Sequence, residues 1–273
     1  MGRLARERGA ALLLTFLMML MLTGLAAAAG IFSQNSVAAA KAHVLDRQAF
    51  YLAEGGWQRA RQALAAGTWV PAVSPGTTYT ESFGAGTYAV TLVHNTDNTY
   101  TMTSSGYVPN QTTPAARRQV SESSVTVSPS GTNLSLAGTA SASSTNGSNV
   151  ASRANDGSSS TRWEAGTADN NQWLQLDYGS ATTTSYFVLT EKDNRINAIS
   201  VDYSSDGSSW TAASSVSAVE SPSKTWQIAF ATITAQYVRV NFTDVDSGKK
   251  PNVKEWESYA STTFDQGTYA TSW

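Results

Sequence analysis

The eight residues Ala154–Thr161 read Ala-Asn-Asp-Gly-Ser-Ser-Ser-Thr and bring several oxygen-bearing side chains into one short segment. Calcium takes about six to eight oxygen ligands from carboxylates, hydroxyls and backbone carbonyls. Gly157 lets the segment bend tightly, because glycine reaches backbone angles closed to other residues. The segment is therefore the best candidate in this sequence for a site with chemistry, a bound calcium ion. The alternative is an ordinary Asp-Gly turn.

Enzymatic chemistry has little support in the sequence. The two histidines are His43 and His94, and no G-x-S-x-G motif accompanies them. Gly248-Lys249 lacks the partner glycine of a phosphate-binding loop. Carboxylates are plentiful, but none lies on a recognisable catalytic frame. We therefore predict that the chain is not an enzyme.

The composition limits the possible partners. Charged residues make up 14% of the 273 residues, against about 25% in an average soluble protein. The formal net charge is −2, so there is no basic field to gather nucleic acid. Cysteine is absent, which excludes disulfides and thiolate metal sites. An exported protein of this kind must be held together by its core or by a metal.

Residues 9–66 form an uninterrupted helix-forming run. The stretch Gly9–Phe32 carries no charge, and its length of roughly 35 Å as a helix is enough to cross a bilayer core. Arg3, Arg6 and Arg8 stand just before it, and a basic flank of this kind keeps the N-terminus on the cytoplasmic side. Apolar residues then recur at helical spacing between Leu45 and Leu64. The run predicts a rod that begins in lipid and ends as an apolar stripe.

Three interpretations of this start remain open. A cleaved secretory signal would use Ala26-Ala27-Ala28 as its cleavage site, although its apolar core would be shorter than this one. A plain signal anchor is the second. The third is a resemblance: Glu7–Leu14 looks like the start of a type IV minor prepilin, and Gln48–Arg61 is similar to the helix of minor pilins of the pilus-assembly type.

The pilin resemblance covers roughly residues 1–127. It implies cleavage after Gly9 by a prepilin peptidase, with a mature start at Ala10. It also implies that the helix packs against other pilin subunits after a stage in the inner membrane. One departure is Leu14, which takes the place of the glutamate of major pilins, a residue that some minor pilins also lack.

Gly67 can end the helix, and Pro71 and Pro75 prevent it from resuming. Short β-rich runs follow. They are Tyr79–Phe83, Thr87–His94, Thr99–Tyr107 and Arg117–Val127. Apolar and polar residues alternate along them, as in an antiparallel sheet with one buried face. We predict an α+β pilin-like unit in which the stripe Leu45–Leu64 covers this sheet.

A second β-rich unit follows a Ser-Pro-Ser-Gly-Thr stretch. Its predicted strands are Trp173–Asp177, Tyr186–Thr190, Ala198–Ser204, Thr225–Phe230, Ala235–Asn241 and Val253–Tyr259. Many short strands separated by turns favour a sandwich or barrel. The whole organisation is then a prepilin-type leader at 1–9, a transmembrane and amphipathic helix at 10–66, a small antiparallel β domain at 67–127, a linker at 128–132, a β-sandwich at 133–260 and a tail at 261–273.

Seven motifs in the second unit occur in the order of the discoidin domain, found in coagulation factors and in bacterial carbohydrate-binding modules. They are Asn133-Leu-Ser, Ala140–Ser144, Ala154–Trp163, Trp173–Gly179, Tyr203–Trp210, Tyr237–Val240 and Glu255–Tyr259. The resemblance implies an all-β jelly-roll sandwich of eight strands, with ligand-binding loops at one end.

This resemblance also implies particular site residues. Carried over by position, the calcium ligands are Asp156, Ser159, Thr161 and Glu255 with the carbonyl of Ala154. Asp244–Gly248 followed by Glu255 partly imitates another kind of calcium loop, and we interpret it as a surface loop. The loops where the family binds sugar offer Arg195, Glu164, Asn170, Asn171, Lys192 and Asn194. Arg195 is the best single candidate, because a guanidinium makes paired hydrogen bonds.

Four tryptophans of this unit, Trp163, Trp173, Trp210 and Trp256, are of a kind that is more often core than ligand-binding in such a fold. The tail carries Phe264 and Tyr269 and either adds an edge strand or begins a further domain.

Our first hypothesis is a minor pilin-like subunit that displays a discoidin module at the cell surface or on a pilus filament and binds a glycan. The second is a structural or assembly subunit that binds no sugar. The third is a membrane-anchored envelope protein whose module accompanies a glycan-degrading enzyme.

Overall fold

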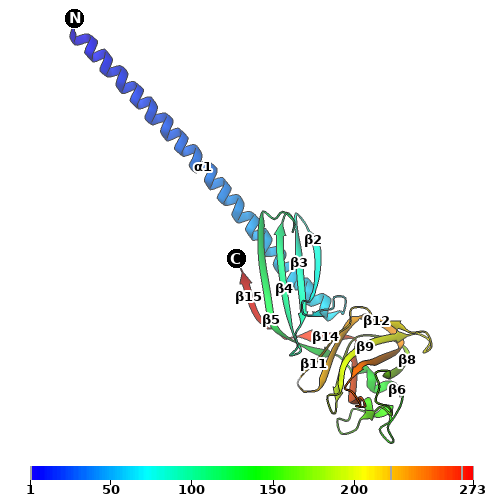
Figure 1. Cartoon of the computed structure of the whole chain (residues 1–273). Coiled ribbons are helices and arrows are strands. Elements are labelled where there is room, and N and C mark those ends of the chain that lie inside the picture. Colours follow the sequence, from blue (N-terminus) through cyan, green and yellow to red (C-terminus); the bar gives the residue numbers. More distant parts are fainter. Residues whose placement is uncertain (1, 222, 266, 273) are drawn as a thin grey trace. The chain divides into compact units, whose positions relative to one another are not determined.

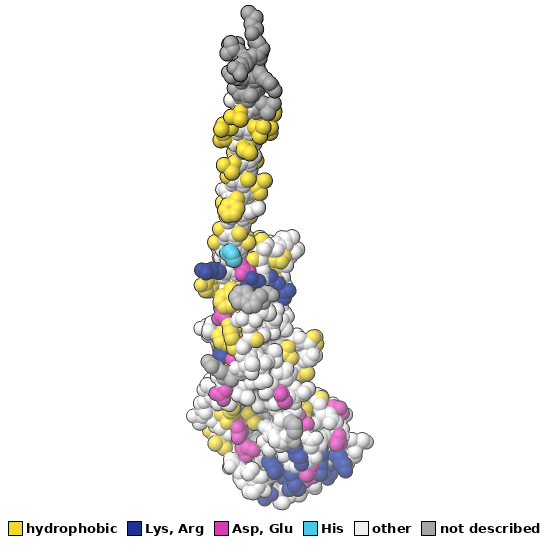
Figure 2. Space-filling model, turned by 90° about the vertical axis from the view of Figure 1, so that its left-hand side faces the viewer, with side chains coloured by type: hydrophobic (Ala, Val, Ile, Leu, Met, Phe, Trp, Pro, Cys, Tyr) yellow, Lys and Arg dark blue, Asp and Glu magenta, His cyan; other side chains and the backbone are white. Residues whose placement is uncertain are grey.

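The apolar start of the chain is helical in the computed structural model, which describes residues 2–221, 223–265 and 267–272, with the backbone alone for 2–13. Helix α1 spans Gly2–Ala65 (Figure 1). Its large apolar side chains between Leu14 and Val37 are exposed, as the yellow side chains in Figure 2 show. Leu14–Ala65 is long and apolar enough to cross a membrane, and an 18-residue window within it has a mean hydropathy of 2.1, although a secretory signal passes the same test. The predicted processing site at Gly9 and Ala10 lies outside the residues whose side chains are described.

The chain divides into two compact units, residues 1–48 and residues 49–273. The second unit holds the last turns of α1 and two sheets. The first of these sheets has seven strands in the described chain. They are β1 (Ala72–Val73), β2 (Thr77–Phe83), β3 (Gly86–His94), β4 (Thr99–Val108), β5 (Ala116–Ser130), β14 (Ser261–Phe264) and β15 (Thr268–Ser272).

The last turns of α1 cover one face of this sheet, as the amphipathic stripe predicts. Ala49, Leu52 and Ala53 are buried there, and so are Ala60 and Leu64 further along the helix. The approach is close because glycines stand at the contact. A Cβ on Gly106 of β4 would lie 2.0 Å from the carbonyl oxygen of Ala49. The predicted helix on an antiparallel sheet is therefore confirmed.

The C-terminal residues return to this first sheet. Both β14 and β15 pair antiparallel with β5, with Ser261 opposite Ser130 and Thr268 opposite Ser123. The tail is thus an edge strand, one of the two predicted alternatives. Ser128–Ser130, which the sequence assigned to a linker, are the end of β5, because β14 supplies the partner strand that a linker would lack. The chain between β5 and β14 is an insert in the sheet.

That insert is a sandwich of eight described strands (Figure 1). They are β6 (Thr139–Ala142), β7 (Trp163–Glu164), β8 (Gln172–Glu191), β9 (Ile196–Ser204), β10 (Thr211–Ala212), β11 (Ser217–Ser221), β12 (Thr225–Val245) and β13 (Asn252–Tyr259). The main order is β10-β9-β12-β8-β13-β7, with every pair antiparallel. Phe187, Phe230, Phe242 and Trp256 lie in its core, and the predicted all-β sandwich is confirmed.

Two strands are longer than the sequence predicts. Trp173–Asp177 and Tyr186–Thr190 are parts of the single strand β8, and Thr225–Phe230 and Ala235–Asn241 are parts of β12. The polar residues between the segments resemble turns, but β8 and β12 stay paired through them, with register shifts next to Ile233 and Tyr237.

The sandwich and the first sheet share apolar core. Tyr186 of β8 and Tyr259 of β13 pack in one cluster with Trp69, Tyr100 and other residues of the helix–sheet layer. The side chain of His94 on β3 hydrogen-bonds through Nδ1 with the hydroxyl of Ser217 on β11 at 2.9 Å. Residues 49–273 are therefore built as one packed body.

Candidate functional site

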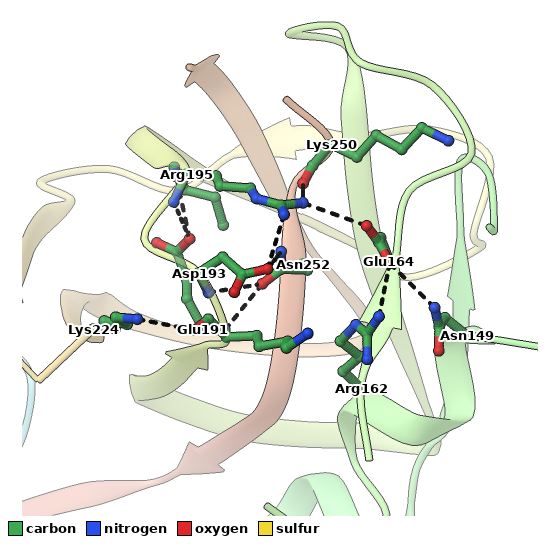
Figure 3. Close-up of polar contacts among 11 residues, drawn as sticks. Asn149, Arg162, Glu164, Glu191, Asp193, Arg195, Lys224, Lys250 and Asn252 are labelled. Carbon is green, nitrogen blue, oxygen red and sulfur yellow. Dashed lines mark hydrogen bonds and ion pairs between the residues drawn. The ribbon is translucent and has the colours of Figure 1, made fainter. Parts of the chain in front are cut away.

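Two loops and one short strand of the sandwich meet around the guanidinium of Arg195 (Figure 3). Arg195 lies in the β8–β9 loop, Glu164 in the short strand β7, and Lys250 in the β12–β13 loop. Nη1 of Arg195 lies 3.3 Å from Oε1 of Glu164 and donates to the carbonyl oxygen of Lys250 at 3.0 Å. The structure therefore brings together the two predicted residues Arg195 and Glu164.

Glu164 is the shared acceptor of this cluster. Its Oε2 accepts from Asn149 and from Arg162, each at 3.1 Å, while Oε1 faces Arg195. Burial acts to raise the pKa of the Glu164 carboxyl, but the hydrogen bonds and charges of Arg162 and Arg195 outweigh it and hold the pKa below its usual value. Glu164 is accordingly an ionised acceptor at neutral pH.

An ion pair and several hydrogen bonds hold the β8–β9 loop in place. Asp193 pairs with Nη2 of Arg195 at 2.9 Å and accepts from the side-chain amide of Asn252 at 3.1 Å. The buried carboxylate of Glu191 accepts from the backbone N–H of Arg195 at 2.7 Å and from the indole of Trp226 at 2.7 Å. The arrangement can present a fixed guanidinium and polar groups to a hydroxyl-rich ligand.

The other predicted ligand-binding residues lie around this cluster. Lys192 and Asn194 are exposed in the same loop, and the amide of Asn194, in its favoured orientation, donates to Glu220. Asn170 accepts from the backbone N–H of Val245 at 3.0 Å and lines an open groove of about 480 Å³ between residues 168–170 and 244–249. Asn171 is exposed beside it. Asn170 and Asn171 contact neither Arg195 nor Glu164 among the hydrogen bonds of the described residues.

The four tryptophans considered in the sequence analysis fall into two pairs. Trp163 and Trp256 are fully buried in the core. Trp173 and Trp210 lie on the outer face of the sandwich, on either side of Arg239, whose Cζ is 4.1 Å and 3.8 Å from the two ring centroids. One face of each ring in the second pair is therefore covered by a protein side chain.

The predicted calcium residues are partly assembled. Asp156 accepts from the hydroxyl of Thr161 at 2.9 Å and 2.7 Å, and Glu255 accepts from the backbone N–H of Gly157 at 3.3 Å. Ser159 is exposed and Ala154 is buried. The predicted surface loop Asp244–Gly248 is only partly a loop: Asp244 and Val245 end β12, because they pair with Ala198 and Ile196 of β9, and residues 246–248 lie in the loop that follows.

One observation tests whether a cation fits this turn. Oε2 of Glu255 is buried and has no hydrogen-bond partner. Burial raises the pKa of Glu255 to about 7, and the nearby negative charge of Asp156 adds to the effect. A cation would satisfy this oxygen and offset the repulsion between the two carboxylates. No group of three or more His, Cys, Asp or Glu forms a metal cluster among the described residues, so the hydroxyls and carbonyls would have to complete the ligand set.

Five residues of the loop cluster are absent from the predicted site. They are Glu191, Asp193, Asn252, Asn149 and Arg162, which hold the loops in place. Glu191 ends an apolar run and precedes the polar residues 192–195, which is the only signal in the sequence. Its burial follows from strand packing that the sequence does not display.

Comparisons with known proteins find matches for the part of the chain that includes the sandwich. Residues 139–266 match the F5/8 type C domain. Chitosan-binding module 1 of a chitosanase/glucanase from Paenibacillus sp. IK-5 is 31% identical over 47% of this chain and 99% of that one, with a TM-score of 0.42. Module 2 of that enzyme, solved with chitotriose, is 27% identical over 46% and 99% of the two chains, with a TM-score of 0.41.

A module from Clostridium perfringens, solved with GalNAc-β-1,3-galactose, is 18% identical over 47% of this chain and 100% of that one, with a TM-score of 0.43. No curated protein matches the chain. Through residues 139–266, the chain belongs to the F5/8 type C, or discoidin-like, domain family. The discoidin resemblance is thus confirmed, whereas the match does not reach α1 and the pilin resemblance stays a prediction.

Proposed function

We propose that this chain is a membrane-anchored surface subunit whose F5/8 type C module binds a glycan through the loops around Arg195. The observation that carries the proposal is the fixed guanidinium, which lies 3.3 Å from Glu164 and 2.9 Å from Asp193. Its side chain keeps 24% of its surface exposed. A guanidinium fixed in this way can donate to neighbouring sugar hydroxyls without first being ordered.

The finer proposal is a minor pilin-like subunit. It is supported by the sequence around Gly9 and by the helix that packs on an antiparallel sheet. In this role the exposed apolar residues of α1 would pack against other pilin subunits, and the module would act in adhesion. Glycan binding and pilus assembly are separate parts of the proposal, so each needs its own experiment.

We also propose that a calcium ion ties the Asp156 turn to Glu255. Asp156, Thr161 and Glu255 would hold it, with Ser159 and the carbonyl of Ala154 completing the set. The ion would supply structural cross-linking in a domain that has no disulfide.

Glycan binding is tested with the full chain in detergent micelles, immobilised and exposed to chitotriose, GalNAc-β-1,3-galactose and a mannuronate oligosaccharide. These probes follow the ligands named for solved modules of related sequence. We expect at least one to bind and Arg195→Ala to weaken it at least tenfold. Arg117→Ala, on β5, is the matched control and should bind as the wild type does. Failure of all three probes to bind would favour the purely structural subunit.

The anchor is tested separately by the mass of the chain isolated from its native membrane. A start at Ala10 requires a prepilin peptidase and supports the pilin-like role. Cleavage at the Ala26–Ala28 cluster, with release from the membrane, would contradict it. An uncleaved chain would instead favour an envelope protein with an accessory module.

A further inference from the structure

The β8–β9 loop has an unusual source of hydrogen bonds. Residues 192–195 lie between two strands and belong to neither. The backbone N–H groups of Lys192 and Asp193 both donate to Oδ1 of Asn252, at 2.9 Å and 3.2 Å. Those of Arg195 and Ile196 both donate to Oε2 of Glu191, at 2.7 Å and 3.2 Å. Two side-chain oxygens therefore bind four backbone amides.

Both acceptors are buried, with 1% of Glu191 and none of Asn252 exposed. A buried carboxylate is costly unless its oxygens are satisfied. Glu191 meets that condition, since its other oxygen accepts from the indole of Trp226 at 2.7 Å. Hydrogen bonds to a charged acceptor are the strong ones, so the backbone at Arg195 is more firmly fixed than in an ordinary loop.

The residues that hold this backbone also support the side chain of Arg195, whose guanidinium is partly exposed. Asn252 donates through Nδ2 to Asp193 at 3.1 Å, and Asp193 pairs with Nη2 of Arg195 at 2.9 Å. Arg195 thus receives support at its backbone from Glu191 and at its head from Asn252 through Asp193. Figure 3 shows the contacts that join Glu191, Asn252, Asp193 and Arg195.

We propose that Glu191 and Asn252 are the positioning residues of the glycan site, which act on the ligand through Arg195 without touching it. This inference rests on the proposed glycan binding. In Glu191→Gln the side chain keeps its shape but loses its charge, and the hydrogen bonds to Arg195 and Ile196 weaken. We expect the affinity for the tightest-binding probe of the panel to fall about tenfold, the effect of weakening one charge-assisted hydrogen bond.

A double-mutant cycle distinguishes positioning from general stabilisation. Affinity is measured for the wild type, Glu191→Gln, Arg195→Ala and the double variant, using the full chain. If Glu191 acts through Arg195, then Glu191→Gln has little further effect once Arg195 is alanine. A merely structural role would weaken binding equally in both backgrounds, and that result would overturn the proposal.

Two further measurements keep the test decisive. Hydrogen exchange at the amides of Arg195 and Ile196, which both donate to Glu191, should speed up in Glu191→Gln, while exchange in β4 stays unchanged. Glu122→Gln, which changes a buried glutamate of the first sheet held by Trp57 and Gly267, should bind glycan normally. If the wild type binds a probe and Glu191→Gln binds it equally well, positioning fails while glycan binding stands. If the wild type binds none, glycan binding fails and positioning fails with it.

Discussion

Arg239 shows how one residue can stabilise the outer face of the sandwich. It is stacked between Trp173 and Trp210, and Nη2 donates to Gln175 at 2.9 Å. Each cation–π contact is worth about 0.5–2 kcal/mol, so Arg239→Ala should lower the free energy of unfolding by about 2–3 kcal/mol. Denaturant unfolding followed by tryptophan fluorescence measures this. Lys254→Ala is the control and should stay within about 0.5 kcal/mol of the wild type; an equally small effect of Arg239→Ala would show that the stack is not stabilising.

Glu255 carries the prediction about calcium. Calcium at about 100 times its Kd should stabilise the folded chain by about 2.7 kcal/mol, and a chelator should reverse the rise in the melting midpoint. Glu255→Gln should lose this response because it removes the charge that faces the turn. Asp206→Asn removes another turn carboxylate, one that accepts from the backbone of Ser208 and Ser209, and should keep the calcium response. An unchanged midpoint in wild-type protein with chelator would exclude the ion.

The sequence predicts the positions of some residues better than those of others. Arg195 and Glu164 stand in loops whose position follows from the order of the motifs, and the structure joins them. Trp163 and Trp173 have similar motif surroundings, yet one is core and the other stacks on Arg239. Glu191 was not predicted, because a buried polar residue is visible only when the strands around it are placed.

Among the structural elements, the contact between α1 and the first sheet gives a matched pair of variants. Gly55 and Gly56 are neighbours in the helix, but a Cβ on Gly55 meets nothing within 4 Å, whereas one on Gly56 would lie 2.6 Å from Tyr88 and Ser104. Gly55→Ala should stabilise by up to about 1 kcal/mol through helix propensity. Gly56→Ala should destabilise by about 1–3 kcal/mol through overpacking.

Thermal unfolding of the two glycine variants measures both effects. Their opposite signs form the test, since helix propensity alone predicts the same gain at both positions. If Gly56→Ala were as stable as Gly55→Ala, the close packing of α1 on the sheet would be wrong.

Element types follow from the sequence better than element lengths. The spacing of apolar residues from Leu45 to Leu64 predicts the buried face of the helix, since a helix has a fixed period. The extents of β8 and β12 do not follow, because polar residues such as Thr182–Thr184 are paired with the other strand instead of forming a turn. Pairing between distant strands is a tertiary effect that local composition does not display.

In the second unit as a whole, residues 49–273, the sandwich is inserted between two strands of the first sheet, β5 and β14. The sequence suggests two successive domains, whereas β14 and β15 return to β5 and Tyr186 packs beside Trp69 and Tyr100. Nothing in a local window shows that residues so far apart share a core. The sandwich and the helix–sheet layer should therefore unfold together, in a single calorimetric transition.

His94 lies where the first sheet meets the sandwich, and its burial makes the stability of this unit depend on pH. It is fully buried between β3 and β11, and burial lowers its pKa to about 4, with the nearby charge of Asp97 acting in the opposite direction. The fold therefore holds the neutral form. Its contribution to stability is complete above the ordinary pKa of about 6.5 and is lost as the pH falls towards 4, by up to about 3 kcal/mol.

Glu220 and Glu255 change stability in the opposite direction. Burial raises the pKa of each to about 7, so their contributions are largest at low pH and are lost as the pH rises through 7. These effects are common to the wild type and a histidine variant, and they cancel when the two are compared.

The difference in melting midpoint between wild type and His94→Gln should therefore shrink as the pH falls from 6.5 to 4. His43→Gln, an exposed substitution on α1, should leave the pH profile unchanged. A constant difference between wild type and His94→Gln would mean that the fold does not favour the neutral form of His94.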